Sequence, residues 1–199
     1  MNLMNKIEKI TVSVPPISGA QQLYLLGTYN LDGTLLLQTQ AFVCYIPGPP
    51  EGNIIGVVAS DQMKNNIMRE KAFSLNLCNI EMRSLAESAF RGYSPETNEE
   101  KEFGYSNGKK LHVPILSISP RVDECKVTQS LQVGDTAIFI SETICSHADS
   151  RFVRAYPESD DDVFDWYASQ DAKNFNPLLY AFKYYTLSEN IGQLNAENW

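Results

Sequence analysis

The chain has 199 residues, of which 43% are hydrophobic and 20% are charged. This balance is typical of a folded globular protein, and the length suits one domain over residues 1–199. The net charge of −8 argues against nucleic acid as the main partner, because binding to a duplex requires a basic surface that displaces counterions.

The number and spacing of the cysteines and histidines predict no metal site. The cysteines lie far apart without a CxxC pair, and two histidines accompany them, so a structural zinc site is not expected. Small buried side chains in a reducing compartment are the simpler interpretation of Cys44, Cys78, Cys125 and Cys145.

Targeting and membrane signals are not recognised in the sequence. The first residues, MNLMNKIEKI, contain no continuous apolar region and no cleavage site of a signal peptide. No apolar run approaches the ~20 residues of a membrane span. We therefore expect a cytoplasmic protein that does not bind membranes.

The first half of the chain predicts strands around one helix. YLLGTYNLDGTLLLQTQAF reads as a hairpin, because the Asp32-Gly33 pair supplies the positive φ of a tight turn. The proline-rich segment PGPPEG is a loop, and NIIGVVA is an apolar run typical of a buried strand. A helix is expected from about Gln62 to Glu70, followed by an alternating strand over Phe73–Cys78.

The second half continues with strands. A helix is expected over Met82–Phe90, then a polar loop, RGYSPETNEEKEFGYSNGKK. Strands return at VPILSIS, ECKVTQSL and TAIFISETICSH, with an exposed loop at ESDDDVF and a short helix in the aromatic tail FNPLLYAFKYYTLSENIG. Many short strands interrupted by two helices indicate a closed or partly closed antiparallel barrel.

The start of the first helix has an unusual charge pattern. Asp61 is a plausible N-cap in the stretch ASDQMKNNI, but Lys64, Asn65 and Asn66 place a cation and amides where the helix is already electropositive. A negative group that the sequence does not supply would explain them.

Common catalytic motifs are absent from the sequence. Neither GxGxxG nor GxxxxGK[ST] occurs, and HExxH and GxSxG are missing too. The remaining functions are those in which a bound ligand carries the reactivity.

Five segments in order are similar to one known family. They are YNLDGTLLLQTQAF, IIGVVASDQMKNNIMREKAFSLNL, RGYSPETNEEKEF, DECKVTQSLQVGDTAIFISETICSHAD and NPLLYAFKYYTLSENIG. Together, from about Leu23 to Gly192, they resemble the flavin reductase-like family, which includes flavoredoxin and small flavin:NAD(P)H reductases. The resemblance implies a mainly β fold, a six-stranded antiparallel Greek-key FMN-binding split barrel with flanking helices.

The resemblance also implies that FMN binds non-covalently at a homodimer interface. The missing negative group would then be the FMN phosphate at the helix N-terminus. The expected cofactor-binding residues in this region are Ser60, Asp61, Lys64, Asn65, Asn66, Ser94 and Lys101. The alternatives are an ordinary solvated Lys64 that pairs with Glu70, a surface Asn66 and a plain N-cap at Ser60.

The flavin ring would lie against the end of the second hairpin strand. Thr39, Gln40, Ala41 and Phe42 match the family's "T-x-S-W/F" segment, whose backbone groups can hydrogen-bond the ring. The alternative is an ordinary strand with alternating faces.

Departures from the family pattern bear on the second substrate. Leu36, Ala41 and Thr136 replace residues that are more polar in many members, which weakens the expectation of a nicotinamide site. His147 and Asp149 do match the family's "h-x-D" segment, and His147 is a candidate for contact with a substrate.

The leading hypothesis is therefore an FMN-dependent oxidoreductase that accepts hydride from NADH or NADPH and passes electrons to free flavin or another acceptor. The alternative is an FMN-binding electron carrier without a nicotinamide site. A barrel that has lost flavin and acts as a binding protein is the third hypothesis.

Overall fold

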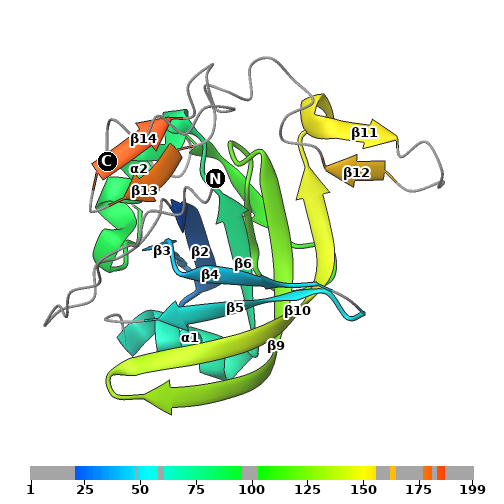
Figure 1. The fold of residues 1–199 in the computed structure, drawn as a ribbon. Coiled ribbons are helices and arrows are strands. Elements are labelled where there is room, and N and C mark those ends of the chain that lie inside the picture. The colour runs from blue at the N-terminus through cyan, green and yellow to red at the C-terminus, as the bar shows by residue number, and fades with distance from the viewer. Residues whose placement is uncertain are drawn as a thin grey trace, which may run out of the picture.

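The main feature of the fold is one seven-stranded antiparallel sheet. The structure, a computed structural model, describes residues 21–47, 49–57, 61–95, 103–155, 162–164, 177–180 and 183–186. The strand order is β3-β2-β6-β9-β10-β5-β4 (Figure 1). The bounds are β2 Tyr24–Tyr29, β3 Leu35–Gln40, β4 Val43–Ile46, β5 Gly52–Val57, β6 Ala72–Leu77, β9 Arg121–Val133 and β10 Thr136–Ala148.

The two edges of this sheet are joined by a two-residue corner. β3 ends at Gln40 and β4 begins at Val43, although they are the opposite edges of the sheet. Flat, seven strands would hold these edges about 29 Å apart, far beyond the reach of two residues. The sheet must therefore curl into a barrel that is split between β3 and β4, which confirms the fold class predicted from the sequence. The corner creates a seventh strand where we expected six.

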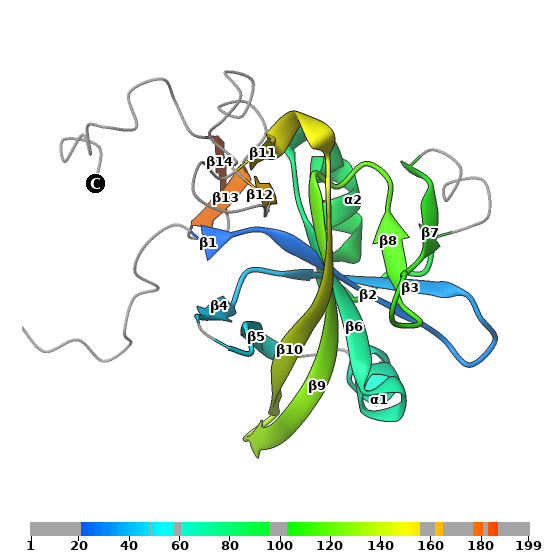
Figure 2. The same cartoon turned by 90° about the vertical axis from the view of Figure 1, so that its right-hand side faces the viewer.

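Two helices lie at different ends of the barrel (Figure 2). α1 spans Asp61–Glu70, and α2 (Arg83–Ser88) is flanked by the short helices η1 (Ile80–Met82) and η2 (Ala89–Arg91). Met63 and Ile67 of α1 are fully buried with Phe73 and Phe139 in the barrel interior, so α1 closes one end. In the part of the chain that the structure describes, no helix is long and apolar enough to cross a membrane.

Three smaller sheets surround the barrel. They are β1 (Gln21–Gln22) with β13 (Pro177–Tyr180) and β14 (Lys183–Thr186), β7 (Tyr105–Asn107) with β8 (Pro114–Leu116), and β11 (Val153–Ala155) with β12 (Asp162–Phe164). A further short helix, η3, spans Ser150–Phe152.

Most predicted elements are present. The hairpin forms with Gly33 at φ 82°, and the first helix begins one residue earlier than expected. The second helix is broken, because its first and last turns are 3-10 helix.

Three predictions need correction. The tail was expected to contain a helix, but its described residues form the strands β13 and β14, because β13 pairs with β14 and, on its other side, with β1 near the start of the chain. The polar loop contains β7, which pairs with β8, and the acidic loop ends in β12. The predicted alternating strand forms as β6, and its polar face is also buried; there Asn76 accepts a hydrogen bond from the backbone N–H of Leu116 in β8.

Candidate functional site

The corner between β3 and β4 is held by one side chain. Gln40 is 5% exposed, and its Nε2 donates to the carbonyl oxygen of Gly56 in β5 at 2.6 Å. Its Oε1 accepts from the backbone N–H groups of Ala41 (3.0 Å) and Phe42 (2.9 Å). Gly56 lies five residues before the start of α1, so Gln40 connects the corner to the strand that leads into that helix.

The neighbours of Gln40 have different surroundings. Thr39 is half-buried, and its hydroxyl donates to the backbone carbonyl of Ala86 in α2. Ala41 is buried, whereas Phe42 is 56% exposed. Because the N–H groups of Ala41 and Phe42 are engaged by Gln40, a ligand at this corner would meet the exposed Phe42 ring rather than those two donors.

The first turns of α1 carry the predicted cation. Lys64 is half-buried and Asn65 is exposed. Glu70, the partner considered for Lys64, instead pairs with Arg69 at 2.7 Å. Among the described residues, no ion pair of Lys64 is found. Asp61 is the first residue of the helix.

Asn66 is the centre of a polar network rather than a surface residue. It is 3% exposed, and its Nδ2 donates to Thr28 Oγ1 (3.2 Å) and Asn30 Oδ1 (2.9 Å). Its own Oδ1 accepts from Arg69 Nη1 at 2.9 Å. Asn30 Nδ2 in turn donates to Ser94 Oγ at 3.2 Å. The structure thus joins two predicted residues, Asn66 and Ser94, through Asn30.

The predicted residues do not all gather in one place. Asn30 and Ser94 lie near the Leu35 end of β3, whereas Gln40 ends that six-residue strand, which spans about 20 Å. Ser60 and Lys101 lie outside the described residues.

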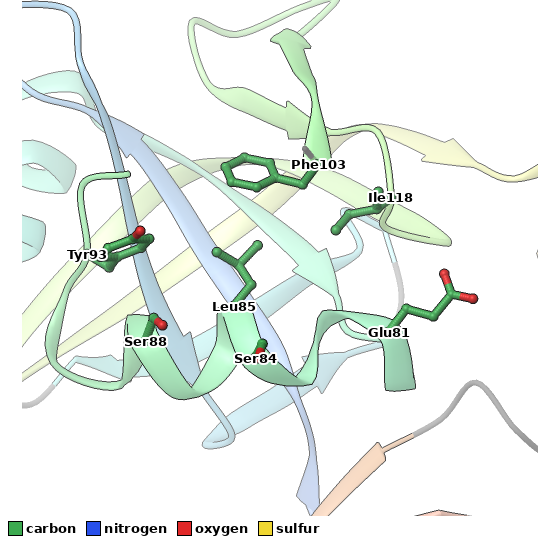
Figure 3. A pocket seen from close by; sticks show the side chains of 7 residues that line it. All are labelled: Glu81, Ser84, Leu85, Ser88, Tyr93, Phe103 and Ile118. Carbon is green, nitrogen blue, oxygen red and sulfur yellow. The ribbon is translucent and has the colours of Figure 1, made fainter. Parts of the chain in front are cut away.

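A pocket of about 320 Å³ opens beside α2 (Figure 3). Ser84, Leu85 and Ser88 of α2 form one wall, and Tyr93 and Phe103 lie across from it. Ile118 and Glu81 complete the lining. The backbone N–H of Tyr93 donates a hydrogen bond to the carbonyl of Leu37 in β3 at 2.7 Å, and the N–H of Leu37 donates to the carbonyl of Tyr93 at 2.8 Å.

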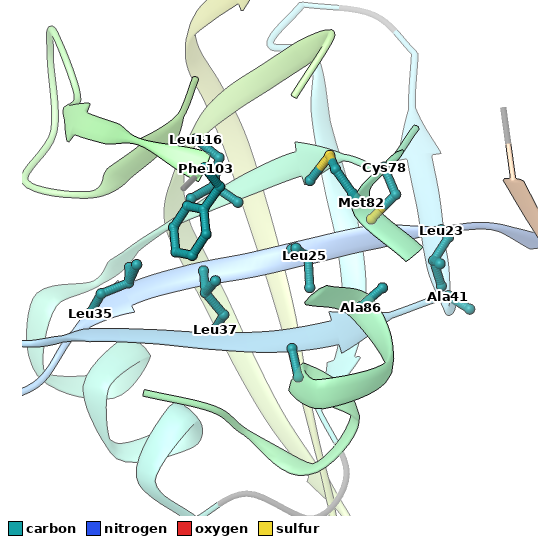
Figure 4. Close-up of a cluster of buried hydrophobic side chains, with 11 residues drawn as sticks. Leu23, Leu25, Leu35, Leu37, Ala41, Cys78, Met82, Ala86, Phe103 and Leu116 are labelled. Atoms are coloured by element: carbon teal, nitrogen blue, oxygen red, sulfur yellow. The ribbon is translucent and has the colours of Figure 1, made fainter. Parts of the chain in front are cut away.

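The wall of this pocket is supported by buried side chains on the far face of α2 and its flanking short helices. Met82, Ala86 and Ala89 are fully buried and pack with Leu25 and Leu37 on the outer face of β2 and β3 (Figure 4). The same turn of α2 thus contacts Thr39 with Ala86 and lines the pocket with Leu85.

Sequence reasoning missed the pocket residues. The spacing of Ser84 and Ser88, four residues apart, puts both hydroxyls on one face of α2, and this signal was available. Tyr93 and Phe103 carried no such signal, because the fold brings them together from either end of a long connection.

His147 is held by a buried carboxylate. Its Nε2 lies 2.7 Å from Oε1 of Glu124, whose side chain is 0% exposed while that of His147 is 32% exposed. Glu124 also accepts three backbone N–H bonds, from Lys109 (2.6 Å), Lys110 (2.8 Å) and Leu111 (2.6 Å).

These hydrogen bonds change the acidity of Glu124. Burial alone would raise the pKa of its carboxyl, but the bonds from His147 and the three N–H groups outweigh it and hold that pKa below its usual value. Asp149, the other matching residue, binds Arg151 at 2.6 Å. Hydrogen bonds from Arg151 are the main reason that the pKa of Asp149 is lowered.

Comparison with known proteins identifies the family. The profile of the flavin reductase like domain matches residues 20–186, which is most of the chain. No curated protein matches the sequence.

Solved structures show the same fold at low identity. Flavoredoxin from Methanosarcina acetivorans has a TM-score of 0.75 and 19% identity, over 96% of this chain and 97% of that chain. A split barrel domain protein from Shewanella frigidimarina NCIMB 400 has a TM-score of 0.71 and 16% identity, over 87% and 85%. The NADH:FAD oxidoreductase of Streptomyces globisporus C-1027 has a TM-score of 0.64 and 12% identity, over 85% and 87%.

The split barrel and the family match over residues 20–186 agree with each other. The family match points to flavin-related redox chemistry. The chain belongs to the flavin reductase-like family.

Proposed function

We propose that the protein is an FMN-dependent oxidoreductase that takes hydride from NADH or NADPH and passes electrons to free flavin or another acceptor. The observation that carries this proposal is the family match over residues 20–186. Bound FMN supplies the hydride and electron chemistry, so the chain itself needs to bind, orient and shield it.

The phosphate of FMN is proposed to bind near the N-terminus of α1. The free N–H groups there favour an anion, and Lys64 adds a positive charge on the same helix. Lys101, Ser60 and Ser94 stay in the proposal on the family resemblance. The structure assigns Asn66 an internal role, so we expect it to support this region rather than to contact the phosphate directly.

The flavin ring is proposed to lie at the corner formed by Thr39, Gln40, Ala41 and Phe42. Gln40 bonds two backbone N–H groups of this corner and ties them to Gly56 in β5, so a ring would meet a backbone that is held in place. Phe42 offers its exposed aromatic face for packing.

We propose that a second copy of the chain covers this corner. β4 is an edge strand; Phe42, directly before it, and Tyr45, within it, are 56% and 49% exposed. An exposed edge with aromatic side chains is a surface that proteins commonly cover by association. Light scattering during gel filtration measures this directly, and a monomer at all concentrations would contradict it.

The alternative function is an FMN-binding electron carrier without a nicotinamide site. Leu36 and Ala41, which replace more polar family residues, are 3% and 6% exposed and pack in hydrophobic clusters. They therefore present no polar group to a second substrate.

One experiment separates the functions. The purified protein is mixed with FMN or, separately, with FAD, and its absorbance is recorded before and after anaerobic NADH and NADPH. A bound FMN spectrum that bleaches supports the reductase and identifies the donor. Bound FMN that does not bleach favours the carrier. Protein that takes up no flavin contradicts both.

A further inference from the structure

Three side chains of the types that commonly bind metal ions gather on one face of the β9–β10 hairpin. Glu124 of β9 lies directly opposite Cys145 of β10, and His147 is two residues further along β10. One donor atom from each lies within 4.8 Å of the others. Side chains two apart in a strand share a face, so all three point the same way.

A β-bulge creates this arrangement. Thr143 of β10 pairs with Cys125 of β9. Cys145, two residues later in β10, pairs with Glu124, only one residue away from Cys125, so Ile144 is the extra residue. Without the bulge, Cys145 would oppose Asp123 and point to the other face of the sheet. The bulge therefore places a thiol beside the buried carboxylate.

The donor set suits a borderline-soft divalent cation. Thiolate, imidazole and carboxylate are the ligands that Zn²⁺ binds in proteins, and three protein ligands with one open position is a common arrangement. In a tetrahedral site the oxygen and nitrogen donors would be about 3.4 Å apart. Glu124 Oε1 and His147 Nε2 are 2.7 Å apart, so a small rotation of the partly exposed His147 ring opens the space.

The carboxylate is already oriented by an outer layer of hydrogen bonds. The three backbone N–H groups of residues 109–111 hold both oxygens of Glu124. A cation at Oε1 would replace the bond to His147 and leave the other three intact. Such outer-layer bonds fix the direction of a metal ligand.

The charges near the cluster permit a dication. Glu124 and a thiolate at Cys145 carry one negative charge each, which together balance two positive charges. Burial is the main reason that the pKa of the Cys145 thiol is raised; the negative charge of Glu124 also opposes the thiolate, and the positive charges of Lys109 and Lys110 favour it. A cation between Glu124 and Cys145 removes that opposition.

We propose that Glu124, Cys145 and His147 form a binding site for a divalent transition-metal cation of the Zn²⁺ class, with one position open to solvent. His147 is also the residue that the sequence suggested for contact with a substrate, but metal binding by these three side chains does not require flavin.

Cobalt titration tests the site. The purified full-length protein is treated with a chelator, desalted and titrated with Co²⁺, which replaces Zn²⁺ and gives a visible ligand-field band in tetrahedral sites and a charge-transfer band with thiolate. We expect one equivalent to bind with both bands, and Zn²⁺ to displace it. Cys145→Ser should remove the charge-transfer band, and His147→Gln should weaken binding at least about tenfold.

The controls change a surface thiol and a surface imidazole that lie outside the cluster. Cys44→Ser and His112→Gln change exposed residues outside the cluster and should leave both bands unchanged. Glu124 is not varied, because it also holds residues 109–111. Circular dichroism confirms that each variant is folded.

Two results would overturn the proposal. One is the absence of both bands at equimolar Co²⁺ in the folded wild-type protein. The other is a charge-transfer band that persists in Cys145→Ser. Neither flavin nor nicotinamide enters the titration, so its failure would leave the proposed function untouched, and the failure of flavin binding would leave this site standing.

Discussion

The carboxamide of Gln40 bonds the carbonyl of Gly56 at 2.6 Å, between strands that sheet pairing does not join directly. The same side chain accepts two backbone N–H groups from the corner that follows β3. A single buried glutamine therefore bridges the split of the barrel.

Replacing Gln40 with Glu should destabilise the fold by about 1–3 kcal/mol at pH 8, because the donor to Gly56 is lost and a charge is buried. Burial raises the pKa of the new carboxyl, and a protonated carboxyl can donate again. The loss of unfolding free energy relative to the wild-type protein should therefore be smallest near pH 4 and grow as the pH rises through the folded-state pKa. Urea unfolding followed by circular dichroism measures it, with the exposed Gln129→Glu on β9 as control. Equal loss in both variants would contradict the role of Gln40.

Two glycines of β5 should respond differently to alanine. A Cβ at Gly52 would lie 1.9 Å from the backbone oxygen of Ser141, whereas at Gly56 the nearest atom is Thr136 Cγ2 at 3.5 Å. Gly52→Ala should therefore lower the free energy of unfolding by about 1–3 kcal/mol, because the backbone of β5 or β10 must move to make room for the methyl group. Gly56→Ala is the matched control. Thermal unfolding of both variants decides the matter, and equal melting temperatures would be inconsistent with the close approach.

Asn66→Ala should cost about 1–3 kcal/mol of stability, because it removes the buried hydrogen bonds from Asn66 to Thr28 and Asn30 and the bond that Asn66 accepts from Arg69. Asn65→Ala, at the exposed neighbouring position of the same helix, should change stability by less than about 0.5 kcal/mol. Denaturant unfolding compares the two. A large effect at Asn65 and a small one at Asn66 would argue for a surface site instead of an internal network.

Lys64→Ala and Lys101→Ala should each weaken FMN binding by about 1–3 kcal/mol, the range for a lost charge-assisted hydrogen bond. Flavin fluorescence titration gives the dissociation constants. The exposed Lys126→Ala on β9 controls for a general loss of positive charge. Unchanged affinity in both variants would remove the phosphate assignment.

The cysteines should fall into distinct classes of reactivity. Burial raises the pKa of the Cys78 and Cys125 thiols well above the ordinary value, while Cys44 is exposed. Since the thiolate is the reacting species, a thiol reagent at pH 8 should modify Cys44 rapidly and reach Cys78 and Cys125 only after unfolding. Counting modified thiols by mass spectrometry in native and denatured protein tests this. Rapid native modification of Cys78 would mean that its cluster opens readily.

The sequence alone determined the features that depend on local pattern. Turn residues and hydrophobic periodicity act over a few neighbouring residues. They were sufficient to predict the hairpin at Asp32-Gly33, the first helix and the long apolar strands. The five motifs, in their order along the chain, were also enough to identify the family.

Only the tertiary structure decided which distant residues meet. Asn66 and Ser94 were both candidate ligands in the sequence, and the fold makes Asn66 the centre of a buried network that reaches Ser94 through Asn30. The tail forms strands because β1, more than 150 residues earlier, supplies a partner for β13. Likewise, one bulged residue turns Cys145 toward Glu124. Strand register and long-range hydrogen bonds depend on partners far away in the chain, and no local periodicity encodes them.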